Sequence, residues 1–265
     1  MDALSYLTEM PLWSLFLITF VVVLLSMLGG RLIGSHVRKR VGEEGEGPVG
    51  SAVGASLGLL AFMLAFTFGI ASNRYETRKE LLLEDVNAIR TAFLRADFLP
   101  EPDSTEVRRL FRDYVHLRAD RSNWAERGRQ EQAIIDSDAM LDNIWSHTVT
   151  VANRNSGSET VALFIDSVNE VRDYNTKRVT VGLKARIPQS IWLALFFVSI
   201  LAMGSMGYQF GLIGSKSLVI SILLALTFSI VMWLIADIDR GLTGAITINQ
   251  GPMLELKEEI DESVP

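Results

Sequence analysis

The chain has 265 residues, of which 49% are hydrophobic and 21% charged, and its mean hydropathy is +0.26. This composition excludes a disordered chain, and the apolar surplus predicts that part of the protein faces lipid. A net charge of −6 argues against nucleic-acid binding, which needs a basic surface, and the absence of cysteine excludes disulfides and thiolate metal sites.

Four long runs without a charged residue hold the apolar surplus. They cover residues 11–30, 47–73, 187–215 and 217–236. Each run is long enough to cross a hydrocarbon core of roughly 30 Å. Each is also apolar on all sides, as burial of a whole helix in lipid requires. We therefore predict four transmembrane helices. The first is not expected to be a cleaved signal peptide, because residues 1–10 include two acids and no lysine or arginine.

A polar segment of mostly helical character, residues 74–186, lies between the second and third spans. From Arg74 to Asp97 it contains neither proline nor glycine and continues directly from the second span, so one long helix is predicted to leave the membrane and stop before Pro100. Beyond this point, apolar residues recur at three-to-four spacing, which indicates a helical bundle. No alternation typical of a strand is present.

The predicted fold class is therefore all-α. The expected division is transmembrane helices 1 and 2 in residues 1–73, a helical soluble domain in 74–186, transmembrane helices 3 and 4 in 187–238, and an acidic C-terminal tail in 239–265. We expect this tail to be solvated or frayed. The candidate N-caps in the soluble domain are Asp103, Ser104 and Ser158.

Motifs for catalysis are missing from the sequence. There is no phosphate-binding loop, no GxSxG, no HExxH and no dinucleotide fingerprint. Three widely separated histidines provide no metal-ligand spacing. The sequence therefore predicts neither an enzyme nor a cofactor or metal site.

Small residues form a stripe on the second predicted span. Gly50, Gly54 and Gly58 make a GxxxGxxxG pattern, with Ser51 beside it. Glycines on one helix face allow close helix approach in lipid, where packing must supply the association. The motif is compatible with packing inside one chain. It is also compatible with a helix that faces neighbouring subunits or a pore around a symmetry axis, and the motif alone does not separate the two.

Phe62 and Phe66 continue the same stripe, one helical turn apart. If identical helices surrounded an axis, the two rings would form stacked apolar collars, which gate ions by dewetting. The alternative is ordinary packing against lipid or the protein core.

The stretch that contains this pair resembles the second membrane helix and its extension in the bestrophins, a family of pentameric ion channels. In that family a phenylalanine pair forms the pore neck. An arginine and an aromatic residue follow, then an acid, an arginine–lysine pair, a valine–asparagine pair and a further arginine. The matching residues here are Phe62, Phe66, Arg74, Tyr75, Glu76, Arg78, Lys79, Val86, Asn87 and Arg90.

The segment after the fourth span is similar to that of a bacterial bestrophin-like family of unknown function, which carries a D-x-D-R-P-F-x-G pattern there. Asp237, Asp239, Arg240 and Gly244 match this pattern, whereas glycine and leucine at 241 and 242 replace its proline and phenylalanine. Because a carboxylate beside a membrane span is costly unless hydrated or paired, we expect the two aspartates to form structural salt bridges with a nearby arginine.

The resemblance implies a homo-oligomer of the bacterial inner membrane, expected to be a pentamer. This oligomer would conduct small inorganic ions through a neck at Phe62 and Phe66. The small residues of the same helix would line the path or pack against other helices; they are Gly50, Ser51, Gly54 and Gly58. Its partners would be the lipid bilayer, further copies of itself and the ions. The competing interpretation is a non-conducting scaffold or sensor whose helical domain binds a partner.

The membrane orientation follows from two opposing arguments. The basic residues of the short loop after the first span, from Arg31 to Arg40, favour a cytoplasmic loop, whereas the resemblance and the basic residues at both membrane-proximal ends of 74–186 favour a cytoplasmic helical domain. We expect the domain to be cytoplasmic.

Overall fold

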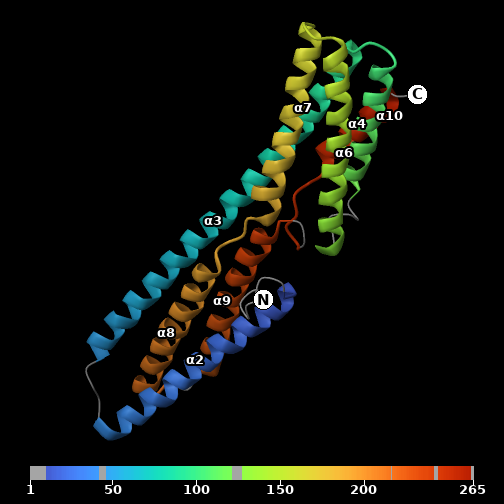
Figure 1. Cartoon of the computed structure of the whole chain (residues 1–265). Coiled ribbons are helices and arrows are strands. Elements are labelled where there is room, and N and C mark those ends of the chain that lie inside the picture. Colours follow the sequence, from blue (N-terminus) through green and yellow to red (C-terminus); the bar gives the residue numbers. More distant parts are fainter. Residues whose placement is uncertain (1–9, 42–45, 121–126, 216, 242–243, 264–265) are drawn as a thin grey trace. The chain divides into compact units, whose positions relative to one another are not determined.

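The computed structural model describes residues 10–41, 46–120, 127–215, 217–241 and 244–263 of the chain (Figure 1). Within these ranges every regular element is a helix, as predicted. The elements are α2 (Leu12–Val41), α3 (Glu46–Arg95), η1 (Ala96–Phe98), α4 (Asp103–Ala119), α6 (Arg127–Arg154), α7 (Glu159–Lys177), the π-helix η2 (Arg178–Lys184), α8 (Gln189–Ile213), α9 (Leu218–Arg240) and α10 (Gly251–Ser263).

The chain divides into two compact units, each built from two segments of the sequence. The first unit comprises Met1–Asn73 and Arg186–Arg240, and the second comprises Arg74–Ala185 and Gly241–Pro265. Helix α3 is continuous across the boundary, so the prediction of one long helix that ends before Pro100 is confirmed.

The four predicted spans fall in four helices that are long and apolar enough to cross a membrane. The helical stretches with this property are Leu12–Arg40, Pro48–Phe98, Glu159–Ile213 and Leu218–Arg240. Helix α2 runs eleven residues past the predicted end of the first span at Gly30, into its basic last turn. The four-helix membrane architecture is thus confirmed.

In the first unit, glycines bring α2 and α8 into backbone contact (Figure 1). A Cβ atom on Gly30 would lie 2.0 Å from the carbonyl oxygen of Gly204, and one on Gly207 would lie 2.0 Å from that of Met27. Gly34 and Gly211 are equally constrained, at 2.1 and 2.3 Å from backbone oxygens. Because no side chain fits between these backbones, glycine is required at this helix crossing.

The second unit is a helical bundle with one apolar core. Helices α3, α4, α6 and α7 contribute residues spaced at three and four, among them the fully buried Ile89, Phe111, Ile144 and Phe164. Ser158 caps α7 by accepting a hydrogen bond from the Val161 amide at 3.4 Å, as predicted. The cap predicted for α4 is wrong, because Asp103 is already the first helical residue and Pro102 precedes it without a side-chain cap bond.

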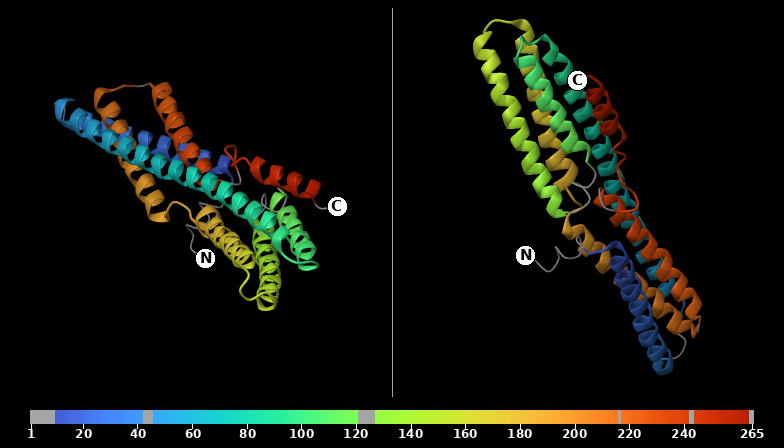
Figure 2. Two further views of the ribbon diagram at one scale, coloured as in Figure 1. Left: turned by 90° about the horizontal axis from the view of Figure 1, so that it is seen from above. Right: turned by 90° about the vertical axis from the view of Figure 1, so that its right-hand side faces the viewer.

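The C-terminal segment is ordered as helix α10, so the expectation of a solvated or frayed tail is wrong for residues 251–263. Met253, Leu256 and Ile260 are buried in the core of the second unit. Helix α10, drawn in red in Figure 2, packs against α4. On the rim, Asp261 accepts a hydrogen bond from the imidazole of His116 at 2.7 Å, and this contact lowers the pKa of the Asp261 carboxyl. The acidic composition concealed an apolar stripe with helical spacing.

We predict that Gly30→Ala destabilises the first unit. The new methyl group would overlap the Gly204 carbonyl, and overpacking of this kind costs about 1–3 kcal/mol, so the apparent melting temperature of the purified protein in detergent should fall. Circular dichroism would measure the change.

Gly29→Ala is the matched control, since a Cβ at the adjacent position meets nothing within 4 Å. Equal melting temperatures for the two variants would contradict the close approach of α2 and α8.

Candidate functional site on helix α3

The phenylalanine pair of α3 points away from the rest of the chain. Phe62 and Phe66 are 68% and 62% exposed, although both are large apolar side chains. Their rings are stacked, with centroids 6.4 Å apart and planes inclined by 16°. The two rings therefore form a continuous apolar ridge along one face of the helix.

The small residues of the same helix are also exposed. Ser51, Gly54 and Gly58 are solvent-accessible in the isolated chain, and a Cβ on either Gly54 or Gly58 would meet none of the described atoms within 4 Å. Gly50 is the exception, because its Cβ would lie 3.2 Å from Nε2 of Gln209. Among the described residues, no close helix contact is made at Gly54 or Gly58. Such contacts are made by the glycines of α2 and α8, which the sequence analysis did not single out.

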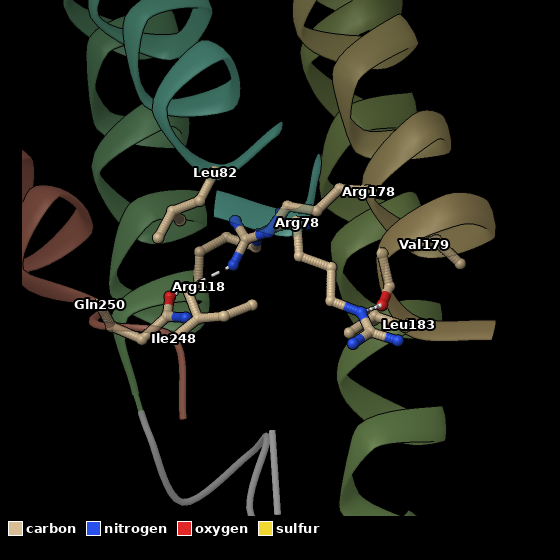
Figure 3. A pocket seen from close by; sticks show the side chains of 9 residues that line it. Arg78, Leu82, Arg118, Arg178, Val179, Leu183, Ile248 and Gln250 are labelled. Carbon is tan, nitrogen blue, oxygen red and sulfur yellow. Dashed lines mark hydrogen bonds between the residues drawn. The ribbon is translucent and has the colours of Figure 1, made fainter. Parts of the chain in front are cut away.

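After Asn73, three residues of the same motif are partly or fully buried in the second unit. Tyr75 is partly buried against the core of the second unit, and Arg74 has a buried Nη1 atom. Arg78 (Figure 3) is 4% exposed and donates from Nε to the carbonyl of Gly182 at 2.8 Å and from Nη2 to that of Ala185 at 3.1 Å. These carbonyls lie at the C-terminal end of η2, where helical carbonyls lack intrahelical partners. Arg78 thus caps η2 with a cationic donor.

Of the remaining motif residues on α3, Val86 is buried in the core of the second unit, whereas the others lie on the solvent-facing side of the helix. Lys79 pairs with Glu76 at 3.9 Å, and both side chains are more than half exposed. Asn87 accepts a hydrogen bond from Arg90 at 3.3 Å, and Arg90 contacts the Glu259 carboxylate of α10 at 2.9 Å. Exposed pairs of this kind contribute about 0–1 kcal/mol each.

Asp237 and Asp239, near the end of α9, are buried, at 0% and 4% exposure. The carboxylate of Asp239 accepts from the backbone amide of Ile187 at 3.1 Å, and the Arg186 guanidinium donates to the Asp239 carbonyl. Arg240 donates to the carbonyl of Met10. These residues thus join the end of α9 to the chain segments that precede α8 and α2.

The turn after α9 differs from the one that a proline would make. Gly241 has φ of 69°, which proline cannot adopt, and a Cβ there would lie 2.9 Å from Nη1 of Arg78. The positive φ therefore favours glycine at this position, and any side chain there would also displace the Arg78 guanidinium. Gly244 lies in an exposed bend, and Leu242 is outside the described residues.

A buried ionic cluster in the second unit was missed by the sequence analysis. Asp85 of α3 is fully buried and accepts from Arg118 of α4 at 2.7 Å and from Arg178 of η2 at 2.6 Å. Arg118 also donates to the side-chain oxygen of Asn175, and burial raises the pKa of the nearby Tyr114 hydroxyl. The available signal was the position of Arg118, four residues after Tyr114 on the apolar face of α4.

The sequence matches a known protein family over most of its length. The family model of the bestrophin-like domain matches residues 16–253. The chain belongs to the bestrophin-like family. A comparison with curated protein sequences found no match.

Solved structures of bacterial bestrophins share the fold. Two variants of a bestrophin homologue from Klebsiella pneumoniae are 14% and 13% identical to this chain, with TM-scores of 0.61 and 0.62. The alignments cover 92% and 96% of this chain and 96% and 97% of those chains. A crystal structure described as a membrane protein has a TM-score of 0.64 at 13% identity and covers 96% of this chain and 97% of its own.

We predict that Arg118→Gln lowers the free energy of unfolding of the second unit by about 3 kcal/mol, because breaking a buried ion pair leaves charge uncompensated. Chemical denaturation followed by tryptophan fluorescence would measure it.

The control is Arg109→Gln, which removes an exposed arginine that pairs with Glu106 and Asp113 on the same helix. This variant should change stability little. Similar losses in both variants would contradict a special role of the buried cluster.

Proposed function

We propose that this bestrophin-like protein is a pentameric ion channel whose neck is formed by Phe62 and Phe66 of helix α3. The observation that carries the proposal is the exposed, stacked phenylalanine pair on a helix that is otherwise suited to lipid. Either lipid or a neighbouring subunit can cover an apolar ridge on a membrane helix. Identical ridges that converge on a symmetry axis would cover one another.

The small residues support the same arrangement. Gly54 and Gly58 lie on the exposed side of α3 with open space beside them. In a ring of subunits they would let neighbouring helices approach closely or would line a wider section of the path, together with Ser51.

The conduction mechanism follows from the chemistry of the neck. A collar of phenylalanine rings offers no hydrogen-bond partner, so a narrow neck would expel water and block ions until it widens. Because such a collar carries no charge, it does not choose between cations and anions. The proposal therefore covers small inorganic ions of either sign.

The alternative is a non-conducting scaffold or sensor in which the aromatic ridge serves only for packing. Oligomeric state separates the two. A channel requires a ring, so native mass spectrometry in mild detergent should find a pentamer, whereas a monomer or dimer would favour the scaffold.

We predict that replacing both Phe62 and Phe66 with alanine raises the ion current several-fold in a reconstituted bilayer, because the neck becomes wider and less apolar. Phe197→Ala is the control, since Phe197 is 63% exposed but lies on α8. Unchanged current in the double variant, or no current from either form, would rule out this neck.

We further propose that the protein resides in the inner membrane with the second unit in the cytoplasm. The chain contains no cysteine, so a single introduced thiol reports its own location. Ser146→Cys, exposed on α6, should resist a membrane-impermeant thiol reagent in intact cells and react after permeabilisation.

Ser217→Cys, between α8 and α9, is the matched position on the opposite side and should be labelled in intact cells. The reverse pattern would show that the second unit is outside.

A further inference from the structure

The first unit contains an open groove between α2, α3 and α8, with a volume of about 720 Å³. Figure 1 shows that α2 ends, α3 begins and α8 ends on the same side of this unit. None of the described residues that line the groove carries a charge. Two from each helix represent its walls: Gly29 and Ile33, Val49 and Ala52, and Ile200 and Tyr208.

The groove begins at the membrane boundary and runs toward the membrane interior. On α2 its outermost lining residue, Ile33, follows Arg31, the first charged residue after the uncharged run. On α3 its outermost lining residue, Pro48, stands at the start of the next uncharged run. On α8 it extends from Tyr208 inward to Ile200, which is about 12 Å along a helix that rises 1.5 Å per residue.

The inner part of the groove has little to offer a polar ligand. The hydroxyl of Ser26 donates to the carbonyl of Ile200 at 2.5 Å, and that of Ser205 donates to the carbonyl of Leu201 at 2.8 Å. The helices satisfy their own backbone groups. A polar ligand would lose its hydration here without gaining new hydrogen bonds. The inner part therefore favours a hydrocarbon chain.

Tyr208 gives the outer end of the groove a different character. Its backbone lies level with Gly34, where a Cβ atom would be 2.1 Å from the Tyr208 carbonyl oxygen, so it is close to the end of the apolar part of α2. Its side chain is partly exposed, and its hydroxyl makes no hydrogen bond with any described residue. Tyrosine at a membrane interface has an apolar ring in the hydrocarbon and a hydroxyl that reaches polar lipid groups.

We propose that this groove binds one acyl chain of a bilayer phospholipid. The chain lies along α8 from Tyr208 toward Ile200, and an ester or phosphate oxygen of the lipid accepts a hydrogen bond from the Tyr208 hydroxyl. An amphiphile matches both parts of the groove, because the inner walls are apolar and the outer end has a donor. The site shares no lining residue with the neck at Phe62 and Phe66 and does not depend on conduction.

Native mass spectrometry after stepwise removal of lipid tests the proposal. The unmodified protein should keep one phospholipid per chain after the loosely held lipids are lost. Gly29→Leu fills the groove from a position where a Cβ meets nothing within 4 Å, so the helices need not move. This variant should retain several-fold less lipid.

Gly69→Leu is the matched control. It makes the same change on α3 at a position that also has open space within 4 Å and does not line the groove. It should keep the lipid. Equal retention by the two variants, or no lipid retained by the unmodified protein, would overturn the proposal.

Tyr208→Phe tests the polar end of the site, because it removes the donor and leaves the apolar walls unchanged. The bound lipid should be lost at a several-fold lower detergent concentration than from the unmodified protein. Tyr75→Phe, in the second unit, should behave as the unmodified protein does. Loss of lipid at one detergent concentration in all three proteins would overturn the assigned contact with Tyr208.

Electron cryomicroscopy of the unmodified protein in nanodiscs of one phospholipid makes the test independent of the variants. An elongated density should run from Tyr208 toward Ile200, with its wider end at the tyrosine hydroxyl. An empty groove, or a groove filled by side chains of a neighbouring subunit, would overturn the proposal.

Discussion

Helix α3 is one unbroken helix whose two halves meet different demands. Residues 48–73 carry no charge and suit lipid, whereas the residues after Arg74 form an amphipathic helix with Leu82 and Ile89 in a soluble core. A helix satisfies its own backbone hydrogen bonds, so it passes between these environments without leaving polar groups unpaired. The register of the helix then links the two halves. One inserted residue would rotate the Phe66 face by about 100° relative to the buried face at Leu82.

Buried charge gives the second unit a specificity that its apolar core alone would lack. Apolar contacts allow neighbouring helices to shift along one another. Hydrogen bonds are directional, and Asp85 accepts them from one residue of α4 and one of η2. Arg78 adds a further directional contact, because the π-helical turn ends with carbonyls that need donors. The three contacts fix α3, α4 and η2 in a single register. The desolvation of these charges means that their net stabilisation is small, so their main effect is on the uniqueness of the packing.

Much of the fold was predictable because lipid and water impose different patterns on the sequence. Absence of charge marked the four spans, and three-to-four spacing marked the bundle. The GxxxG pattern was less informative. It occurs at Gly30–Gly34 and Gly207–Gly211, which pack together, and at Gly54–Gly58, where the described chain leaves open space. The GxxxG spacing indicates only that another helix can approach closely. The tertiary structure determines which helix does so.

The candidate site was predictable only in part. Phe62 and Phe66 were identified by spacing and resemblance, but the role of Arg78 depends on carbonyls more than a hundred residues away in the sequence. The cluster at Asp85 likewise unites three distant segments, and no local pattern pairs them. Helix α10 was missed because its acids dominate the composition, although Met253, Leu256 and Ile260 lie on one face.

The division of the second unit into two sequence segments has a topological consequence. Helix α10 packs on α4, yet α8 and α9 lie between these helices in the sequence. Two segments that fold together outside the membrane must be separated by an even number of crossings. The contact between α10 and α4 therefore requires that α8 and α9 either both span the bilayer or both stay out of it. Their apolar composition decides for spanning, and the parity of the chain path means that α8 and α9 must be assigned to the membrane together.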